Sequence, residues 1–194
     1  MERRSPLEIE VKVPVDDVQS VAQKARGLGF ELVRERHFEA NLLYDFPDRS
    51  LSITGCLLRV RETAEGALLT FKGRVVEDPQ YKVRPERETV CDSGEEIRAI
   101  LENIGLKPFF RYEKYREEFR GEGGLLCLDE MPFGHYLELE GPPSAIEALA
   151  RALDLSPETF LKRSYADLYG EHCRKLGIPF GDIIFAKKAD EKNP

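Results

Sequence analysis

The sequence predicts an α+β fold in which a closed antiparallel eight-stranded β-barrel carries its helices on the outside. Two observations lead to this fold class. Most of the expected strands alternate apolar with charged residues, and two stretches 76 residues apart repeat the order strand, helix, glycine and long strand. Two related halves of this kind can close one barrel between them.

The expected strands begin near the N-terminus and recur along the chain. Residues 7–13 place apolar side chains on one face and Glu8, Glu10 and Lys12 on the other. Residues 30–46 are predicted to form one or two strands before the turn-rich segment 47–55. The remaining strands are expected over residues 56–62, 67–73, 81–90, 109–120, 124–130 and 135–140.

Four helices are expected between or after these strands. A helix start is indicated by a residue that can cap it, in two cases with a glutamate three residues later. These starts are Asp16, Ser93 with Glu96, Ser144 with Glu147, and Ser164. Gly27 and Gly29 are expected to end the first helix.

The internal repeat relates two sets of residues. When the sequence is compared with itself at a shift of 76 residues, similar residues align in order. The first set is Glu10, Asp16, Val21, Ala25, Leu28, Gly29 and Phe30, and the aligned set is Glu86, Asp92, Ile97, Leu101, Ile104, Gly105 and Leu106. Coincidence between two ordinary strand-helix-strand units is the alternative explanation.

Length and composition limit the classes of protein. The 194 residues fit one domain, residues 1–194, with a core over about 7–176 and a polar C-terminal tail. A net charge of −7 argues against a broad basic surface for nucleic acid. No apolar stretch is long enough for a membrane span or the core of a signal peptide, so a cytoplasmic location is expected. A homodimer is left open.

Cysteine and histidine give no catalytic or zinc motif. The cysteines at 56, 91, 127 and 173 are widely separated and are expected to be reduced structural thiols. His37, His135 and His172 share no spacing and are expected to be surface or structural residues.

The charged strand faces are the strongest functional feature. They carry seven basic and seven acidic residues, namely Lys12, Arg59, Arg61, Lys72, Arg84, Lys114, Arg116, Glu8, Glu10, Glu86, Glu88, Asp129, Glu138 and Glu140. An ordinary sheet with one solvated face explains any single strand. Repetition across seven segments favours a barrel whose charged faces line a polar tunnel.

A tunnel with both signs of charge predicts a ligand with both signs. Clustered carboxylates suit Mg²⁺ or Mn²⁺, while Arg and Lys suit phosphate oxygens. A metal-bound polyphosphate uses both sets. No P-loop motif is present, so side chains on strands must hold the phosphates.

The ordered motifs also resemble a known family. They are E-x-E-x-K at 8–12, Tyr-Asp at 44–45, L-R-V-R at 58–61, T-F-K-G at 70–73, R-x-E-x-E at 84–88, K-x-R at 114–116, L-D-E at 128–130, E-x-E at 138–140, and Ser-Tyr at 164–165. Over about residues 7–169 the chain is similar to the CYTH family of triphosphate tunnel metalloenzymes. That family includes class IV adenylyl cyclases, thiamine triphosphatases and inorganic triphosphatases.

The resemblance implies roles for the charged residues. Around the metal it places Glu8, Glu10, Asp129, Glu138 and Glu140. For the triphosphate it implies Lys12, Arg59, Arg61, Lys72, Arg84, Lys114 and Arg116, with Lys12, Lys72 and Arg116 as catalytic residues. Glu86, Glu88, Lys162 and Arg163 are expected in the tunnel without an assigned role. Crowding among the acids further predicts that Glu138→Gln leaves the stability of the ligand-free fold unchanged or raises it.

The residue patterns of segments 81–92 and 110–119 are most similar to those of the class IV adenylyl cyclases, which convert ATP to cyclic AMP and pyrophosphate. The alternative is an inorganic or thiamine triphosphatase acting on tripolyphosphate or thiamine triphosphate. A non-catalytic polyphosphate-binding module needs mainly cations, which the acidic set disfavours. The acidic net charge disfavours an enzyme acting on nucleic-acid 5′-triphosphates.

Overall fold

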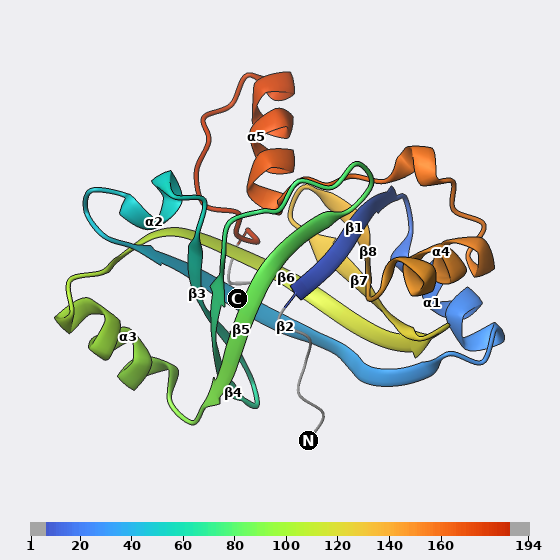
Figure 1. The fold of residues 1–194 in the computed structure, drawn as a ribbon, viewed down its shortest axis with the longest axis horizontal. Helices are drawn as coiled ribbons and strands as arrows, with labels where there is room; N and C mark the ends of the chain where they lie inside the picture. Colours follow the sequence, from blue (N-terminus) through green and yellow to red (C-terminus); the bar gives the residue numbers. More distant parts are fainter. Residues whose placement is uncertain (1–6, 187–194) are drawn as a thin grey trace, which may run out of the picture.

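The barrel predicted from the sequence is present and closed. The structure, a computed structural model, describes residues 7–186. Its antiparallel strands follow the ring order β1-β5-β4-β3-β2-β6-β7-β8, and β8 pairs back with β1 (Figure 1). They are β1 (Leu7–Val15), β2 (Glu31–Asp45), β3 (Leu57–Thr63), β4 (Gly66–Lys72), β5 (Lys82–Cys91), β6 (Lys107–Gly121), β7 (Gly124–Met131) and β8 (Gly134–Glu140). The predicted fold class is confirmed.

The helices lie on the outside of the barrel, as expected (Figure 1). They are α1 (Val18–Gly27), α2 (Ser50–Ile53), α3 (Gly94–Asn103), α4 (Pro143–Ala152) and α5 (Tyr165–Leu176), with a 3₁₀ turn at Pro157–Thr159. α1 and α4 cover β7 and β8, and α3 covers β3 and β4. Within residues 7–186, no helix combines the length and apolar character needed to cross a membrane.

The repeat found in the sequence corresponds to two halves of the fold. A shift of 76 residues carries the bounds of α1 onto those of α3, and the bounds of β2 onto those of β6. Each half therefore runs strand, helix, long strand and hairpin, and the first half contains α2 in addition. Each helix packs on the hairpin of the other half, because α1 contacts β7 and β8 while α3 contacts β3 and β4. This exchange ties the halves into one barrel.

The helix caps agree with expectation at two places and differ at two. Ser93 and Ser164 cap α3 and α5 as predicted. α1 is capped by Asp17 instead of Asp16, and its carboxylate accepts a hydrogen bond from the amide of Gln19 at 2.8 Å. α4 has no side-chain cap and begins with proline at its first position, where the missing N–H costs nothing, so the expected box at Ser144 does not form.

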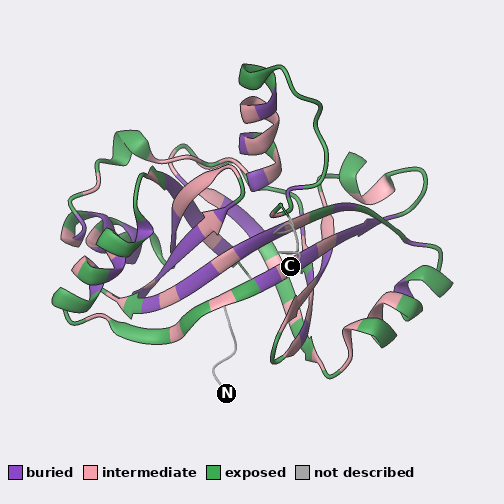
Figure 2. Ribbon diagram, turned by 180° about the vertical axis from the view of Figure 1, so that it is seen from behind, coloured by how far each residue is buried: buried purple, intermediate pink, exposed green. Residues whose placement is uncertain are grey.

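The apolar core lies between the outer face of the barrel and the helices. Figure 2 shows buried and less buried residues alternating along the strands. The largest cluster joins Val11 and Val13 of β1 to Ala22 of α1 and to Ile146 and Leu149 of α4. With apolar side chains directed outward under the helices, the charged side chains of the same strands face the interior.

Ordered packing continues beyond the expected end of the core at residue 176. Ile183 is buried, its amide donates to the carbonyl of Arg111, and its carbonyl accepts from the amide of Glu113. Part of the segment after α5 therefore pairs with β6. The polar tail predicted from residue 186 onward lies, apart from Ala186, outside the described residues.

All four cysteines are unpaired, as expected. Cys127 and Cys173 are buried, whereas Cys56 and Cys91 are partly buried.

Candidate active site

The barrel encloses a polar cavity of about 1840 Å³. Charged residues from β1, β3, β4, β5, β6 and β8 line it, as the alternation predicted. The predicted site residues that line its walls are Glu8, Glu10, Lys12, Arg59, Arg61, Lys72, Arg84, Glu86, Glu88, Lys114, Arg116, Glu138 and Glu140. Asp129 is buried behind this lining, with no exposed surface.

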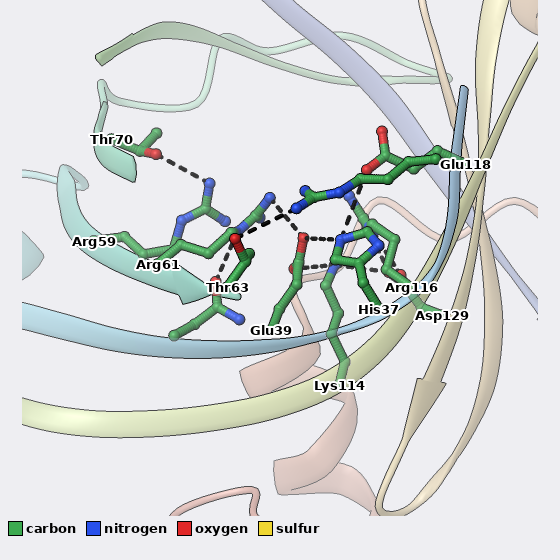
Figure 3. Close-up of polar contacts among 12 residues, drawn as sticks. His37, Glu39, Arg59, Arg61, Thr63, Thr70, Lys114, Arg116, Glu118 and Asp129 are labelled. Carbon is green, nitrogen blue, oxygen red and sulfur yellow. Dashed lines mark hydrogen bonds and ion pairs between the residues drawn. The ribbon is translucent and has the colours of Figure 1, made fainter. Parts of the chain in front are cut away.

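Two arginines of β3 face the cavity from neighbouring inward positions (Figure 3). Arg59 donates to the hydroxyls of Tyr112 and Thr70, each at 3.1 Å. Its Nε is buried and has no hydrogen-bond acceptor. Arg61 donates from Nε to the side-chain oxygen of Asn41 at 3.0 Å and pairs with Glu39 at 3.1 Å. The unmatched donor on Arg59 fits an anion that would enter the cavity.

Asp129 organises the cations on the opposite wall. Its carboxylate accepts from Lys114 Nζ at 2.9 Å, from Arg116 Nε at 2.6 Å and from the hydroxyl of Tyr165 at 2.6 Å. Arg116 makes a second bond to it through Nη2. With its acceptor positions filled by these donors, Asp129 is suited to positioning Lys114 and Arg116. The metal role that the resemblance implied for it does not fit this geometry.

Glu138 is likewise held by cations. It forms ion pairs with Arg116 and with Lys12, the latter at 3.0 Å. Burial would raise the pKa of Glu138, but Arg116 and Lys12 outweigh it and hold the pKa well below its usual range. These ion pairs argue against the expectation that Glu138→Gln relieves repulsion, because this carboxylate is paired with two cations.

The crowded acids are Glu8, Glu10 and Glu140, on β1 and β8. Glu10 lies opposite Glu140 in the strand register. Burial, followed by the charges of Glu8, Glu10 and Glu138, raises the pKa of Glu140 to about 7. Burial and Glu10 also raise the pKa of Glu8, whose Oε2 is buried without a hydrogen-bond donor. Lys72 pairs with Glu8 through Oε1 only, so a divalent ion would add positive charge beside both of these carboxylates.

Glu10 is the better neutralised member of this cluster. Its Oε1 accepts from Lys12 at 2.9 Å and from Lys82 at 2.7 Å. Burial opposes ionisation, but these two lysines hold the pKa of Glu10 below its usual range. The oxygen ligands needed for Mg²⁺ or Mn²⁺ are thus present on β1 and β8, and the residues fit such an ion.

Glu86 and Glu88 line the cavity beside basic or hydroxyl groups. Glu86 lies 3.4 Å from Lys72 Nζ, which also pairs with Glu8. Glu88 accepts a hydrogen bond from Thr70 at 3.3 Å. These two contacts link β4 to β5.

Arg84 lines the cavity, but backbone carbonyls occupy its guanidinium. It donates to the carbonyl of Gly73 from Nε at 2.9 Å and from Nη2 at 2.6 Å, and to those of Gly55 and Lys72 at 3.2 Å. These contacts tie the loop after β4 to the start of β3. They favour a structural role over the phosphate role implied by the resemblance.

We expect Arg84→Ala to destabilise the fold by about 2 kcal/mol, because it leaves buried carbonyls without donors. Urea denaturation followed by circular dichroism measures this change. Unchanged stability together with a raised KM for the substrate would restore the phosphate role of Arg84.

Lys162 and Arg163 do not line the cavity. Lys162 is exposed and donates to the carbonyls of Asp78 and Pro79, at 2.7 and 3.0 Å. Arg163 pairs with Glu171 on α5. Both residues lie just before α5 and are absent from the cavity lining, so their expected place in the tunnel is not found.

Several residues of the interior were not identified from the sequence. They are His37, Glu39, Asn41, Lys82, Tyr112, Glu118 and Tyr165. His37, Glu39 and Asn41 alternate along the second half of β2, and Lys82 and Glu118 extend the alternation of β5 and β6 by one step. A period of two over these strands is the signal that could have found them.

The domain model for CYTH matches residues 6–165. The chain belongs to the CYTH family. The recognised domain includes all eight strands, and the cavity inside them is the triphosphate tunnel of this fold. Members of the family are adenylyl cyclases or triphosphatases and are generally metal-dependent.

The names of proteins similar to this CYTH chain mention adenylate cyclase and, in one case, triphosphatase activity. A protein of Methanocaldococcus jannaschii, provisionally named an adenylate cyclase, is 28% identical over 175 residues, which cover 84% of this chain and 99% of that protein. A structure from Vibrio parahaemolyticus with the same provisional name has a TM-score of 0.74 at 23% identity and covers 86% and 99% of the two chains. A Hippeastrum structure, described as a candidate adenylyl cyclase with a dominant triphosphatase activity, has a TM-score of 0.57 at 19% identity and covers 94% and 92%.

Proposed function

We propose that this CYTH protein is a divalent-metal-dependent adenylyl cyclase that converts ATP into cyclic AMP and pyrophosphate in the barrel cavity. One observation carries the proposal. Arg59 Nε lacks an acceptor and Glu8 Oε2 lacks a donor, and both residues line the same cavity. A metal-bound triphosphate supplies the missing anion and the missing cation together.

The phosphates would be held by the cations of β1, β3, β4 and β6. These are Lys12, Arg59, Arg61, Lys72, Lys114 and Arg116. In cyclisation the ribose 3′-oxygen attacks the α-phosphorus, the bond to pyrophosphate breaks and a proton is released. Lys12, Lys72 and Arg116 would neutralise the charge that grows on the departing pyrophosphate, and their positions are fixed beforehand by ion pairs.

The metal would be held by Glu8, Glu10 and Glu140. When bound, Mg²⁺ or Mn²⁺ supplies positive charge at the phosphate oxygens and helps to orient them for in-line attack. Glu138 would act indirectly, because it pairs with Lys12 and Arg116 and keeps both in the cavity.

The size of the cavity favours ATP over bare tripolyphosphate. Its volume of about 1840 Å³ exceeds the range of roughly 300–1,000 Å³ for typical small-molecule pockets. The lining also includes the apolar residues Val33, Leu68 and Val90, which cannot bind phosphate. These features leave space for a nucleoside next to the charged walls.

Triphosphate hydrolysis is the second candidate, and the activity described for the Hippeastrum protein of the same fold supports it. Water would then attack the terminal phosphorus and orthophosphate would leave. The same cations and metal serve this reaction, so the tunnel accommodates both chemistries.

Product analysis tests the proposal. We expect purified protein with Mg²⁺ or Mn²⁺ to convert ATP into equal amounts of cyclic AMP and pyrophosphate, and excess chelator to stop the reaction. Parallel incubations with tripolyphosphate and thiamine triphosphate identify the alternative substrates. Orthophosphate without cyclic AMP would assign a triphosphatase, and thermal stabilisation by tripolyphosphate without turnover of any substrate would assign a binding module.

A further inference from the structure

A histidine and two glutamates gather in the barrel away from the acids of β1 and β8. They are His37 and Glu39 on β2 and Glu118 on β6, and one ligand atom of each lies within 4.8 Å of the others (Figure 3). β2 stands four places from β1 in the ring of strands, so this cluster is on the opposite wall from Glu8 and Glu10.

The backbone fixes the orientation of His37. Its Nδ1 lies 2.9 Å from the carbonyl oxygen of Glu35. A carbonyl can only accept, so Nδ1 carries a proton and Nε2 is directed toward the two carboxylates. Nε2 lies 3.4 Å from Glu39 and 4.0 Å from Glu118. This pairing of Nδ1–H with a carbonyl is the arrangement typical of a metal-binding histidine.

Glu39 is the fully buried carboxylate of this cluster. Its side chain has no exposed surface, and its Oε2 accepts no hydrogen bond. Lys114 Nζ lies 3.5 Å from that oxygen, and Arg61 pairs with Oε1 at 3.1 Å. The oxygen that faces His37 is Oε1, so an ion bound beside His37 would share this oxygen with Arg61. Glu118 lines the cavity, so an ion bound to this cluster could take its remaining ligands from the cavity.

The separations suit a small tetrahedral ion. Zinc bonds of 2.0–2.1 Å to nitrogen or oxygen place neighbouring ligand atoms about 3.3 Å apart. The 3.4 Å between His37 Nε2 and Glu39 Oε1 already has this value, and the 4.0 Å to Glu118 Oε1 requires a small side-chain movement. Imidazole is a good ligand for Zn²⁺, whereas Mg²⁺ and Mn²⁺ prefer oxygen ligands.

We propose that His37, Glu39 and Glu118 form a second cation site, which takes a divalent transition-metal ion such as Zn²⁺. The competing arrangement is an imidazolium that bridges the two carboxylates by charge alone. In that case the cluster is complete without an ion, and Zn²⁺ does not displace the proton at neutral pH.

The experiment uses Zn²⁺ with the full chain and no nucleotide, so its outcome does not depend on the reaction assigned to the tunnel. Long-range ¹H–¹⁵N spectra report on each imidazole nitrogen of His37, His135 and His172. One equivalent of Zn²⁺ is expected to shift Nε2 of His37 and to leave the other two histidines unchanged. Absence of this shift, or equal shifts at all three histidines, would overturn the proposal.

Variants supply the second measurement. We expect His37→Ala to lower Zn²⁺ affinity by at least about 100-fold in calorimetric titration, since the loss of outer partners alone typically costs 10- to 100-fold. His135→Ala is the matched control, because His135 Nδ1 also lies near a backbone carbonyl, that of Asp16 at 3.1 Å, but belongs to no such cluster in residues 7–186.

Glu118→Gln guards against a folding artefact. Glu118 is less buried than Glu39, and glutamine preserves its shape. We expect this variant to melt like the wild type and to lose Zn²⁺ affinity by a similar factor. Wild-type Zn²⁺ affinity in both the His37 and the Glu118 variants would exclude the site.

Discussion

Replacing Arg59 with alanine is expected to lower kcat/KM for ATP by about 100- to 1000-fold, the range seen when one preorganised donor to a developing charge is removed. Arg59 is buried, two of its nitrogens are oriented by Tyr112 and Thr70, and its Nε has no acceptor within the protein. Its charge is therefore held in place for a ligand. Phosphate charge is present in the ground state and moves during reaction, so both KM and kcat should change.

Two controls separate geometry from charge in this experiment. Arg59→Lys keeps the charge but loses the planar fork, and we expect it to recover only a small part of the lost activity. Arg151→Ala removes an exposed arginine on α4, outside the barrel, and should leave the kinetics unchanged. Wild-type kinetics in Arg59→Ala would place this side chain outside the substrate site.

The alternation along the strands was sufficient to predict the barrel and most of its lining. It holds because one face of each strand must meet the outer helices, which leaves the charged face for the interior. β2 is the exception. Its pairing with β6 shifts register between Leu32 and Arg34 and again between Arg34 and His37. Each irregularity changes which side chains face inward, so the period of two is interrupted just before His37 and Glu39.

The roles of individual acids could not be predicted from their strands alone. Asp129 and Glu140 both occupy inward positions, but their surroundings differ. Asp129 on β7 lies opposite Arg116 of β6, whereas Glu140 of β8 lies opposite Glu10 of β1. Asp129 and Arg116 are only 13 positions apart, but Glu140 meets Glu10 because β8 closes the ring onto β1, which joins the two ends of the strand order. The residues next to Glu140 in the sequence therefore do not show that Glu10 lies beside it.

Arg84 illustrates the same limit for a basic residue. Its inward position was predicted, but its partners are the carbonyls of Gly55 and Gly73 in two different loops. A backbone carbonyl can accept a hydrogen bond whatever side chain its residue has. An arginine that binds backbone carbonyls therefore has the same sequence pattern as an arginine that binds phosphate.

Glu138→Gln and Glu140→Gln are expected to change the stability of the metal-free protein in opposite directions. Glu138 is buried and pairs with Lys12 and Arg116, so its neutralisation leaves these cations with less compensation and should destabilise the fold by about 3 kcal/mol. Glu140 is crowded by Glu8 and Glu10, so its neutralisation should stabilise the fold at alkaline pH.

The pH dependence follows from the pKa of Glu140, which is raised from 4.5 to about 7 in the folded protein. Between these values the folded state binds more protons at this group than the unfolded state does. The contribution of Glu140 therefore makes stability fall as pH rises through this window, and the loss is complete above pH 7. Allowing for the solvent that reaches this partly buried carboxyl, the loss is about 2 kcal/mol.

Urea denaturation of the metal-free proteins at pH 5 and pH 8 measures these effects. Wild type should lose stability between the two values, whereas Glu140→Gln should lose less and exceed wild type at pH 8 by about 2 kcal/mol. Adding Mg²⁺ with tripolyphosphate should stabilise wild type through binding to the folded state and stabilise Glu140→Gln much less. A Glu140→Gln protein that is less stable than wild type at pH 8, yet gains as much from the ligands, would identify Glu140 as a structural partner and exclude it from the metal site.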